Sequence, residues 1–262
     1  MIACLDMYNW PESQFAFDGL WRHCRDVLRH HGVDAPETLS AQGEDLATAA
    51  RKGDLILGQV CGITFARANQ VQPTYCALGA FIAADGDWPH GDWPDGHYTA
   101  VLIARDQNAT LAGLLNQRFA VNAWGSYSGW YGLRHHLLTQ GLSPDRPDHV
   151  ISGGHRRSVE MVASGKADWA AIDSISWGMV RRFSPEVAAA VQVIGHTDPA
   201  PGLPLVTSPH TPPAIKALLK QTLTDYLTNA QGQADFAAIG IAGIAEIAAA
   251  SYAPLRHHAG DC

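Results

Sequence analysis

The sequence predicts an α/β protein, because apolar strand-like runs alternate with helical patterns along the chain. Residues 151–177, ISGGHRRSVEMVASGKADWAAIDSISW, show this best, since they give in order a strand end, a turn, a helix and a second strand. Gly153 and Gly154 permit a tight turn, and Gly165 stands where a left-handed C-cap belongs. The apolar run Trp169–Ile172 is typical of a strand buried on both faces, which favours largely parallel sheets.

The other elements follow from the same patterns. A helix from about Glu12 to His31 places its apolar side chains on one stripe and ends at Gly32. The helix after Gly129 ends at Gly141, and the alanine-rich tail from Asp235 to Ala250 is expected to be helical. Further strands are expected at residues 2–5, 54–57, 99–104, 119–122, 150–151, 191–195 and 203–207, a helix at 213–229 and a long loop at 84–97.

Composition limits the class of protein. The chain has 262 residues, of which 47% are hydrophobic and 16% are charged, so it can form one large domain or two lobes. A net charge of −7 argues against nucleic acid or an anionic membrane as a partner, although backbone amides can still hold a small anion. The sequence has no run of about 20 apolar residues that could cross a membrane. Its start carries no signal peptide, so we expect either a cytoplasmic protein or a chain that begins near its mature start.

The five cysteines form no C-x-x-C pair, which leaves zinc-ribbon and thioredoxin motifs unsupported. Cys4 and Cys24 fall at core positions of predicted elements. Cys61 and Cys76 could pair only in an oxidising compartment.

Two strand-to-helix turns carry the chemistry that points to a ligand. In open α/β sheets, ligands lie beyond the carboxyl ends of strands, where helix N-termini present free amides. Ser126, Tyr127 and Ser128 occupy one such turn, where the serines could either donate to an oxyanion or simply cap the helix. His155 occupies the second turn, where it could contact a ligand or be an ordinary loop histidine. The next strand is followed by Asp173, Ser174 and Ser176, which could receive the cationic or hydroxyl part of the ligand. Asp173 could equally cap the next helix.

Other polar groups give weaker signals. The loop 84–97 contains several Asp and His residues, but their spacing matches no EF-hand, so we expect a solvated loop or lid and no metal or other cofactor. His257 and His258 are expected to lie in a frayed tail. Ser128, His155 and Asp173 could be assembled into a catalytic set, although no sequence spacing supports one.

Five motifs in this order resemble the phosphate/phosphite/phosphonate-binding proteins of ABC importers, the phosphonate-binding branch of the type II periplasmic binding proteins. The matched segments are Leu5–Glu12 with L-P-M-Y-D-x-P-E, Gly58–Gly62 with S/G-Q-T-C-G, Ala120–Gly129 with A-V-N and S-x-S-G, Ser152–Trp177 with S-G-S-H and A-D-I-A-A-I-D-x-x-S/T-W, and Pro201–Ser208 with P-G-L-P-x-x-T-S.

The resemblance implies two α/β lobes joined by two crossover strands, with the ligand in a cleft that closes by a hinge. Residues 1–98 and 204–262 would form lobe 1, and residues 99–203 would form lobe 2. Lobe 2 would hold a small oxyanion or phosphonate-like ligand through helix N-termini, and lobe 1 and the hinge would close over it. The ligand-binding residues implied are Tyr8, Gln59, Tyr98, Ser126, Tyr127, Ser128, His155 and Asp173.

The sequence departs from the family pattern in three places. Asp6 replaces a proline and adds a carboxylate, Gly154 replaces a serine of S-G-S-H, and Ala80 stands where the family has a cysteine. The last change makes a Cys61–Cys76 bridge doubtful, so we expect free thiols.

The function expected is that of a solute-binding protein of an ABC importer, without catalysis, periplasmic by resemblance and delivering its ligand to a permease. The alternatives are a cytoplasmic small-molecule sensor and a cleft enzyme that acts on a small phosphorylated or anionic compound.

Overall fold

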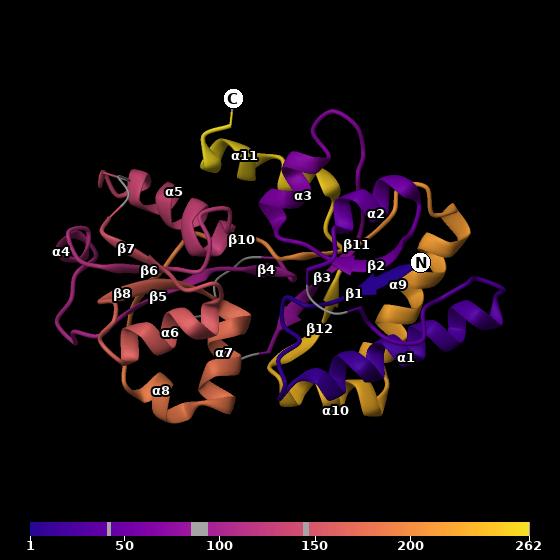
Figure 1. The fold of residues 1–262 in the computed structure, drawn as a ribbon, viewed down its shortest axis with the longest axis horizontal. Coiled ribbons are helices and arrows are strands. Elements are labelled where there is room, and N and C mark those ends of the chain that lie inside the picture. The colour runs from indigo at the N-terminus through magenta and orange to yellow at the C-terminus, as the bar shows by residue number, and fades with distance from the viewer. Residues whose placement is uncertain (41–42, 85–93, 144–146, 262) are drawn as a thin grey trace. The chain divides into compact units, whose positions relative to one another are not determined.

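The computed structural model describes residues 1–262 except 41–42, 85–93, 144–146 and 262 (Figure 1). The chain divides into two compact units. Unit 1 contains Met1–Ala84, Pro94–Gly96 and Pro201–Ala253, and unit 2 contains His97–Ala200 and residues 254–261. The main difference from the expected division concerns the C-terminal segment after Ala253. We expected this segment in lobe 1, but it belongs to unit 2.

Unit 1 is built on a five-stranded sheet of order β1-β2-β11-β3-β12. The strands β1 and β2 are parallel, whereas β11 runs antiparallel to both β2 and β3, and β12 runs antiparallel to β3. Phe17, Phe81 and Phe236 meet in the core at centroid distances of 5.5 to 6.1 Å, which joins two helices to the sheet. The elements of this unit are β1 (Ile2–Cys4), α1 (Gln14–His30), α2 (Leu46–Lys52), β2 (Leu55–Gln59), α3 (Gly62–Ala68), β3 (Cys76–Ala83), β11 (Pro204–Thr207), α9 (Pro213–Thr228), α10 (Ala230–Ala238), β12 (Ile241–Ala245) and η2 (Ala249–Tyr252).

Unit 2 is built on a second five-stranded sheet, of order β7-β6-β8-β5-β9. In Figure 1 this sheet has α5 on one side and α6, α7 and α8 on the other. The ring centroids of Phe119 and Trp169 lie 4.5 Å apart on neighbouring strands at the centre of the core. The elements are β4 (His97–Tyr98), β5 (Ala100–Ala104), α4 (Leu111–Leu114), β6 (Phe119–Val121), η1 (Tyr127–Tyr131), α5 (Gly132–Thr139), β7 (His149–Ile151), α6 (His155–Ala163), β8 (Trp169–Asp173), α7 (Ser174–Phe183), α8 (Pro185–Ala189), β9 (Gln192–His196) and α11 (Pro254–Ala259). The short strand β10 (Ala200–Pro201) pairs with β4.

Both five-stranded sheets are mixed, so the expectation of largely parallel sheets was wrong. In unit 2, β5 is antiparallel to both β8 and β9, and only β6, β7 and β8 run parallel. A fully buried apolar run such as β5 or β8 looks the same whichever direction its neighbours take. Burial of a strand on both faces therefore does not indicate whether its neighbours run parallel or antiparallel to it.

The tail is helical up to Ala238 as predicted, but the prediction is wrong for the residues that follow. The helix α10 ends at Ala238, Gly240 adopts a φ of +83°, and residues 241–245 then form β12 against β3. Glycine ends the helix because it reaches this left-handed conformation without steric cost. The two isoleucines of β12 then complete the edge of the sheet, and this tertiary pairing overrides the helical propensity of the alanines.

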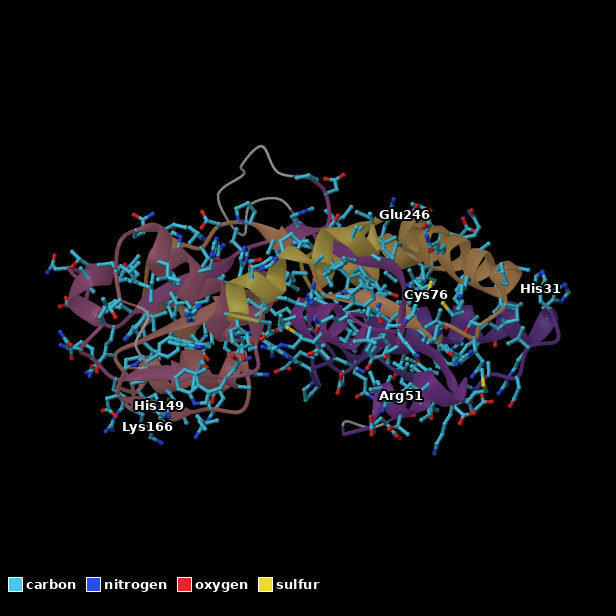
Figure 2. The ribbon with its side chains drawn as sticks, turned by 90° about the horizontal axis from the view of Figure 1, so that it is seen from above. His31, Arg51, Cys76, His149, Lys166 and Glu246 are labelled. Carbon is cyan, nitrogen blue, oxygen red and sulfur yellow. The ribbon has the colours of Figure 1, made fainter. Side chains whose placement is uncertain are left out.

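Two sequence expectations concern thiols and the long loop. Cys4, Cys24, Cys61 and Cys76 form no disulfide, and Cys76 lies on β3 (Figure 2). Most of the acidic and histidine-rich loop, including Asp85, His90 and Asp92, falls outside the described residues.

No described helix has the length and apolar character that crossing a bilayer requires.

Candidate functional site

One edge of the sheet in unit 2 gathers polar side chains. The strands β7, β6 and β8 are parallel, so their carboxyl ends share this edge. Asn122 follows β6, Ser152 follows β7, and Asp173 ends β8. Because β5 runs antiparallel to β8 with Ala100 opposite Asp173, Thr99 lies at the same edge.

Ser126 caps the helical segment that follows β6. Its Oγ atom accepts the N–H of Gly129 at 3.1 Å. The segment begins as one π-helical turn, Tyr127–Tyr131, and continues directly into α5. The capping interpretation of Ser126 therefore describes what its side chain does, and it orients the first turn so that its amides lie at the sheet edge.

Gly129 is required by the packing of Asn122. A Cβ atom at Gly129 would stand 1.8 Å from the Asn122 Oδ1 atom, which no substitution could accommodate without moving the amide. The same oxygen is buried and has no hydrogen-bond partner among the described residues. The glycine of the S-x-S-G motif thus lets the strand end and the helix start approach closely.

Ser128 and His155 join the two turns. The Ser128 Oγ atom lies 3.0 Å from His155 Nε2, and the Asn122 Nδ2 atom lies 3.3 Å from the same nitrogen. Ser128 is buried, and His155 is the first residue of α6. The turns that follow β6 and β7 are therefore connected through one imidazole ring.

The imidazole of His155 is neutral at pH 7. Burial lowers the pKa of His155 to about 4, although a backbone hydrogen bond with Ala171 acts in the opposite direction. The two arginines that follow it both form ion pairs with Glu160, at 3.7 Å for Arg156 and 2.7 Å for Arg157. Besides the Asp173 carboxylate, the polar groups described at this edge are therefore neutral hydroxyls, amides and an uncharged ring.

Asp173 caps α7. Its Oδ1 atom accepts the N–H of Ser176 at 2.9 Å, while its own backbone N–H lies 3.4 Å from His155 Nδ1. In a serine–histidine–aspartate triad the carboxylate itself orients the histidine. Here the backbone of Asp173 approaches the ring, and its carboxylate holds the start of a helix.

Tyr127 uses its hydroxyl within unit 2. The hydroxyl lies 2.7 Å from Nδ1 of His258, whose ring stacks on that of His135 at 3.7 Å. The expectation of a frayed tail was therefore wrong, because residues 254–259 form the helix α11, which packs on α5 and η1. The signal in the sequence for an ordered C-terminal segment was the pair of aromatic rings at His257 and His258.

The other three predicted residues are Tyr8, Gln59 and Tyr98. Tyr8 and Gln59 belong to unit 1, where Tyr8 packs on Phe81 and the Gln59 Nε2 atom lies 3.5 Å from the Leu203 carbonyl oxygen. Tyr98 is buried in unit 2, next to Thr99. The structure thus brings together Ser126, Tyr127, Ser128, His155 and Asp173 within unit 2.

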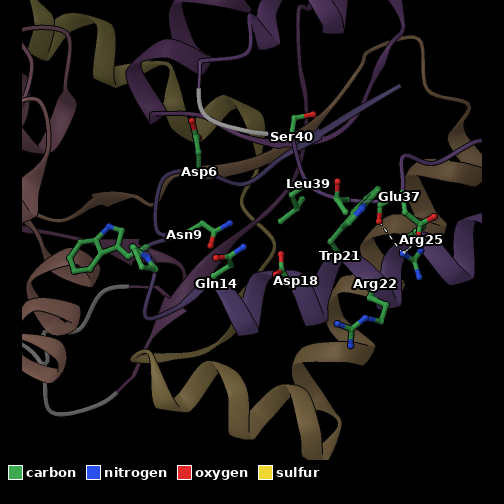
Figure 3. Close-up of a pocket in the computed structure, with 13 residues that line it drawn as sticks. Asp6, Asn9, Gln14, Asp18, Trp21, Arg22, Arg25, Glu37, Leu39 and Ser40 are labelled. Carbon is green, nitrogen blue, oxygen red and sulfur yellow. Dashed lines mark hydrogen bonds and ion pairs between the residues drawn. The ribbon is translucent and has the colours of Figure 1, made fainter.

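Unit 1 has a groove of its own, with a volume of about 900 Å³ (Figure 3). Asp6, Asn9, Gln14 and Asp18 lie along it, and burial raises the pKa of the Asp6 carboxyl group. Arg22 and Arg25 line the groove as well, and Arg25 pairs with Glu37.

Sequence reasoning missed two residues at the sheet edge of unit 2. Asn122 was part of a recognised motif but was not assigned to the site, and Thr99 was not assigned to it either. Both directly flank a buried strand at this edge. That position is the signal that identified Asp173 and Ser174 and could have found them.

The chain matches a family of known function. Residues 32–252 match the family model described as ABC transporter, phosphonate, periplasmic substrate-binding protein. No curated protein matches the sequence.

Solved structures support the same fold. The binding protein component of an ABC phosphonate transporter from Pseudomonas aeruginosa is similar with a TM-score of 0.73 and 16% identity, over 99% of this chain and 85% of that one. PhnD1 from Prochlorococcus marinus, solved with methylphosphonate, is similar with a TM-score of 0.73 and 15% identity over 95% of each chain. XAC2383 from Xanthomonas citri, solved with ATP, is similar with a TM-score of 0.72 and 14% identity over 100% of this chain and 96% of that one. The fold is that of the type II periplasmic binding proteins.

Proposed function

The chain belongs to the phosphonate family of periplasmic substrate-binding proteins of ABC transporters, and we propose that it binds a small oxyanion of the phosphonate class at the sheet edge of unit 2. Solute binding is the role of this family. The observation that carries the proposal is the joining of two helix starts, η1 and α6, through Ser128 and His155 at 3.0 Å.

The chemistry of this edge suits a tetrahedral oxyanion. The first amides of a helix have no partner within the helix, and the positive end of the helix dipole favours negative charge. The Ser128 hydroxyl adds a donor between the two helix starts. Both arginines at the start of α6 form ion pairs with Glu160, and the donors that we assign to the ligand are neutral, as in other amide cradles.

Binding without turnover follows from the state of His155. A pKa near 4 makes this imidazole a weak base at neutral pH, so it activates Ser128 poorly. The Asp173 carboxylate caps α7 at Ser176. These two observations favour binding over the alternative of a cleft enzyme.

The other family properties stay proposals for this chain. We expect delivery of the ligand to an ABC permease and a periplasmic location. Tyr8, Gln59 and Tyr98 stay predictions from the family resemblance. For Gln59 the support is its buried Oε1 atom, which has no hydrogen-bond partner among the described residues.

Calorimetric titration with phosphate, phosphite and methylphosphonate tests the proposal. The wild-type chain should bind at least one of the three anions, and Ser128→Ala should weaken that binding by about 1.5–3 kcal/mol through loss of a charge-assisted hydrogen bond. Ser208→Ala is the matched control, because Ser208 is equally buried but donates to Ala50 in unit 1. Wild-type affinity in Ser128→Ala would contradict the proposed cradle.

Phosphorus NMR of the bound anion addresses turnover. Unaltered anion after long incubation at stoichiometric protein supports binding alone. Repeated turnover that disappears in His155→Ala would replace the proposal with an enzyme.

A further inference from the structure

We infer that the hydroxyl groups of Thr99 and Ser174 form a second polar subsite beside the oxyanion cradle, which binds an uncharged hydroxyl group of the ligand. The inference rests on the proposed function and narrows its ligand class to phosphonates whose carbon substituent carries a hydroxyl.

Both hydroxyls are buried without a partner. Thr99 is 4% exposed and Ser174 is 0% exposed. Among the described residues neither Oγ atom has a hydrogen-bond partner. Buried hydroxyls are nearly always bonded, because burying one unpaired costs about 1–3 kcal/mol. Two such hydroxyls on residues joined by a backbone hydrogen bond therefore point to a group that they are arranged to bind.

The pair is continuous with the cradle. The N–H of Ser174 donates to the carbonyl oxygen of Thr99 at 3.1 Å, so the two residues face each other across the edge of the sheet. Ser174 follows Asp173, whose N–H lies 3.4 Å from His155 Nδ1. The His155 ring in turn reaches Ser128. The subsite and the cradle are thus linked through consecutive contacts of unit 2.

The chemistry of the neighbours selects a hydroxyl. Ser174 is the first residue of the ten-residue helix α7, whose positive end is already capped by the Asp173 carboxylate, so the two opposite charges offset each other and leave no net charge that favours a charged group. The buried Asp173 carboxylate would repel a second carboxylate on the ligand. A hydroxyl is uncharged, and it can accept from one side chain and donate to the other.

The first test measures the protein without ligand. Thr99→Val keeps the shape of the side chain and removes an unpaired buried hydroxyl, so the melting temperature should rise by about 2 °C. Thr207→Val is the matched control, because Thr207 is equally buried in a strand but donates to the Leu55 carbonyl oxygen at 3.2 Å. The control should melt at a lower temperature than the wild-type protein. A fall for Thr99→Val as well would show that its hydroxyl is structural and would overturn the inference.

The second test compares three ligands by calorimetry. The wild-type protein should bind hydroxymethylphosphonate more tightly than methylphosphonate or aminomethylphosphonate. Thr99→Val and Ser174→Ala should each weaken hydroxymethylphosphonate binding about five- to tenfold, which is the loss of one neutral hydrogen bond, and leave methylphosphonate within about twofold. Thr207→Val should leave both affinities unchanged.

The outcomes separate this inference from the proposed function. If methylphosphonate binds and the variants weaken the phosphonates equally, the cradle stands and the hydroxyl subsite is wrong. A preference for aminomethylphosphonate in the wild-type protein would likewise overturn the hydroxyl assignment. If none of the three phosphonates binds but phosphate or phosphite does, the hydroxyl subsite is wrong and the cradle stands. If no anion of either set binds, both proposals fall.

Discussion

The Tyr127 hydroxyl lies 2.7 Å from Nδ1 of His258, although 131 residues separate them in the sequence. The His258 ring also stacks on His135 at an interplanar angle of 12°, and Arg134 donates to the His258 carbonyl oxygen at 3.2 Å. The C-terminal helix α11 is therefore fixed to the helical segment that begins at the proposed anion cradle. Through this contact the Tyr127 hydroxyl joins the two helical segments, and its predicted contact with the ligand stays a prediction.

Tyr127→Phe tests this attachment. Loss of the hydroxyl should lower the free energy of unfolding by about 1 kcal/mol and speed amide hydrogen exchange in residues 254–259. His258→Ala should have a larger effect, because it also removes the stacking on His135. Urea unfolding and hydrogen exchange are the measurements.

His257→Ala is the control for this prediction. His257 is exposed, so its replacement should change the free energy of unfolding by less than about 0.5 kcal/mol. Equal effects of the two histidine substitutions would show that the Tyr127–His258 contact does not fix the helix.

Gly129→Ala should be strongly unfavourable. Its Cβ atom would meet the Asn122 amide at 1.8 Å, so the strand end and the helix start must separate. We expect a loss of about 1–3 kcal/mol in the free energy of unfolding, as for an overpacked core. Gly125→Ala, only four residues away, has no atom within 4 Å of its Cβ and should be close to neutral. Similar stabilities of the two variants in urea unfolding would refute this packing argument.

The sequence predicted most elements of unit 2 because its signals there are local. Gly165 and Gly141 end helices with φ values of +71° and +70°, and the apolar run 169–172 is part of β8. The β12 strand was missed because it depends on pairing with β3, a partner about 160 residues earlier in the chain. Strand direction depends in the same way on non-local pairing, which local periodicity does not record.

The candidate site was predictable to a similar extent. Motif order indicated both turns, and position after a strand indicated Ser128, His155 and Asp173. The individual roles were not predictable, because they depend on distances between segments. Ser126 and Asp173 cap helices, and the Tyr127 hydroxyl meets a histidine from the end of the chain.

Ser126→Ala separates capping from ligand contact. Removal of the cap should lower the free energy of unfolding by about 1 kcal/mol, and Ser126→Asp should retain most of the stability because aspartate also caps helices well. Thermal unfolding of the three proteins measures this. If Ser126→Ala were as stable as the wild-type chain, the hydrogen bond to Gly129 would contribute nothing to folding.

The low pKa of His155 predicts a specific loss of stability in acid. Its value is about 4 in the folded chain and 6.5 when unperturbed, so between these pH values the unfolded chain takes up a proton that the folded chain does not. The contribution of His155 to the free energy of unfolding is therefore at its full value above pH 6.5, falls by up to about 1.4 kcal/mol per pH unit below it, and levels off below pH 4. Burial lowers the pKa of His196 and His258 as well, so these residues act in the same direction.

His155→Gln isolates the contribution of His155, since glutamine does not titrate. Above pH 6.5 the variant should be less stable than the wild-type protein, because it disturbs the contacts with Ser128 and Asn122. As the pH falls from 6.5 to 4, this difference should shrink by about 3 kcal/mol or less and can change sign. Urea unfolding at a series of pH values measures both curves. Curves that stay parallel through this range would show that His155 titrates at the same pH in the folded and unfolded chains, and that its ring is not desolvated.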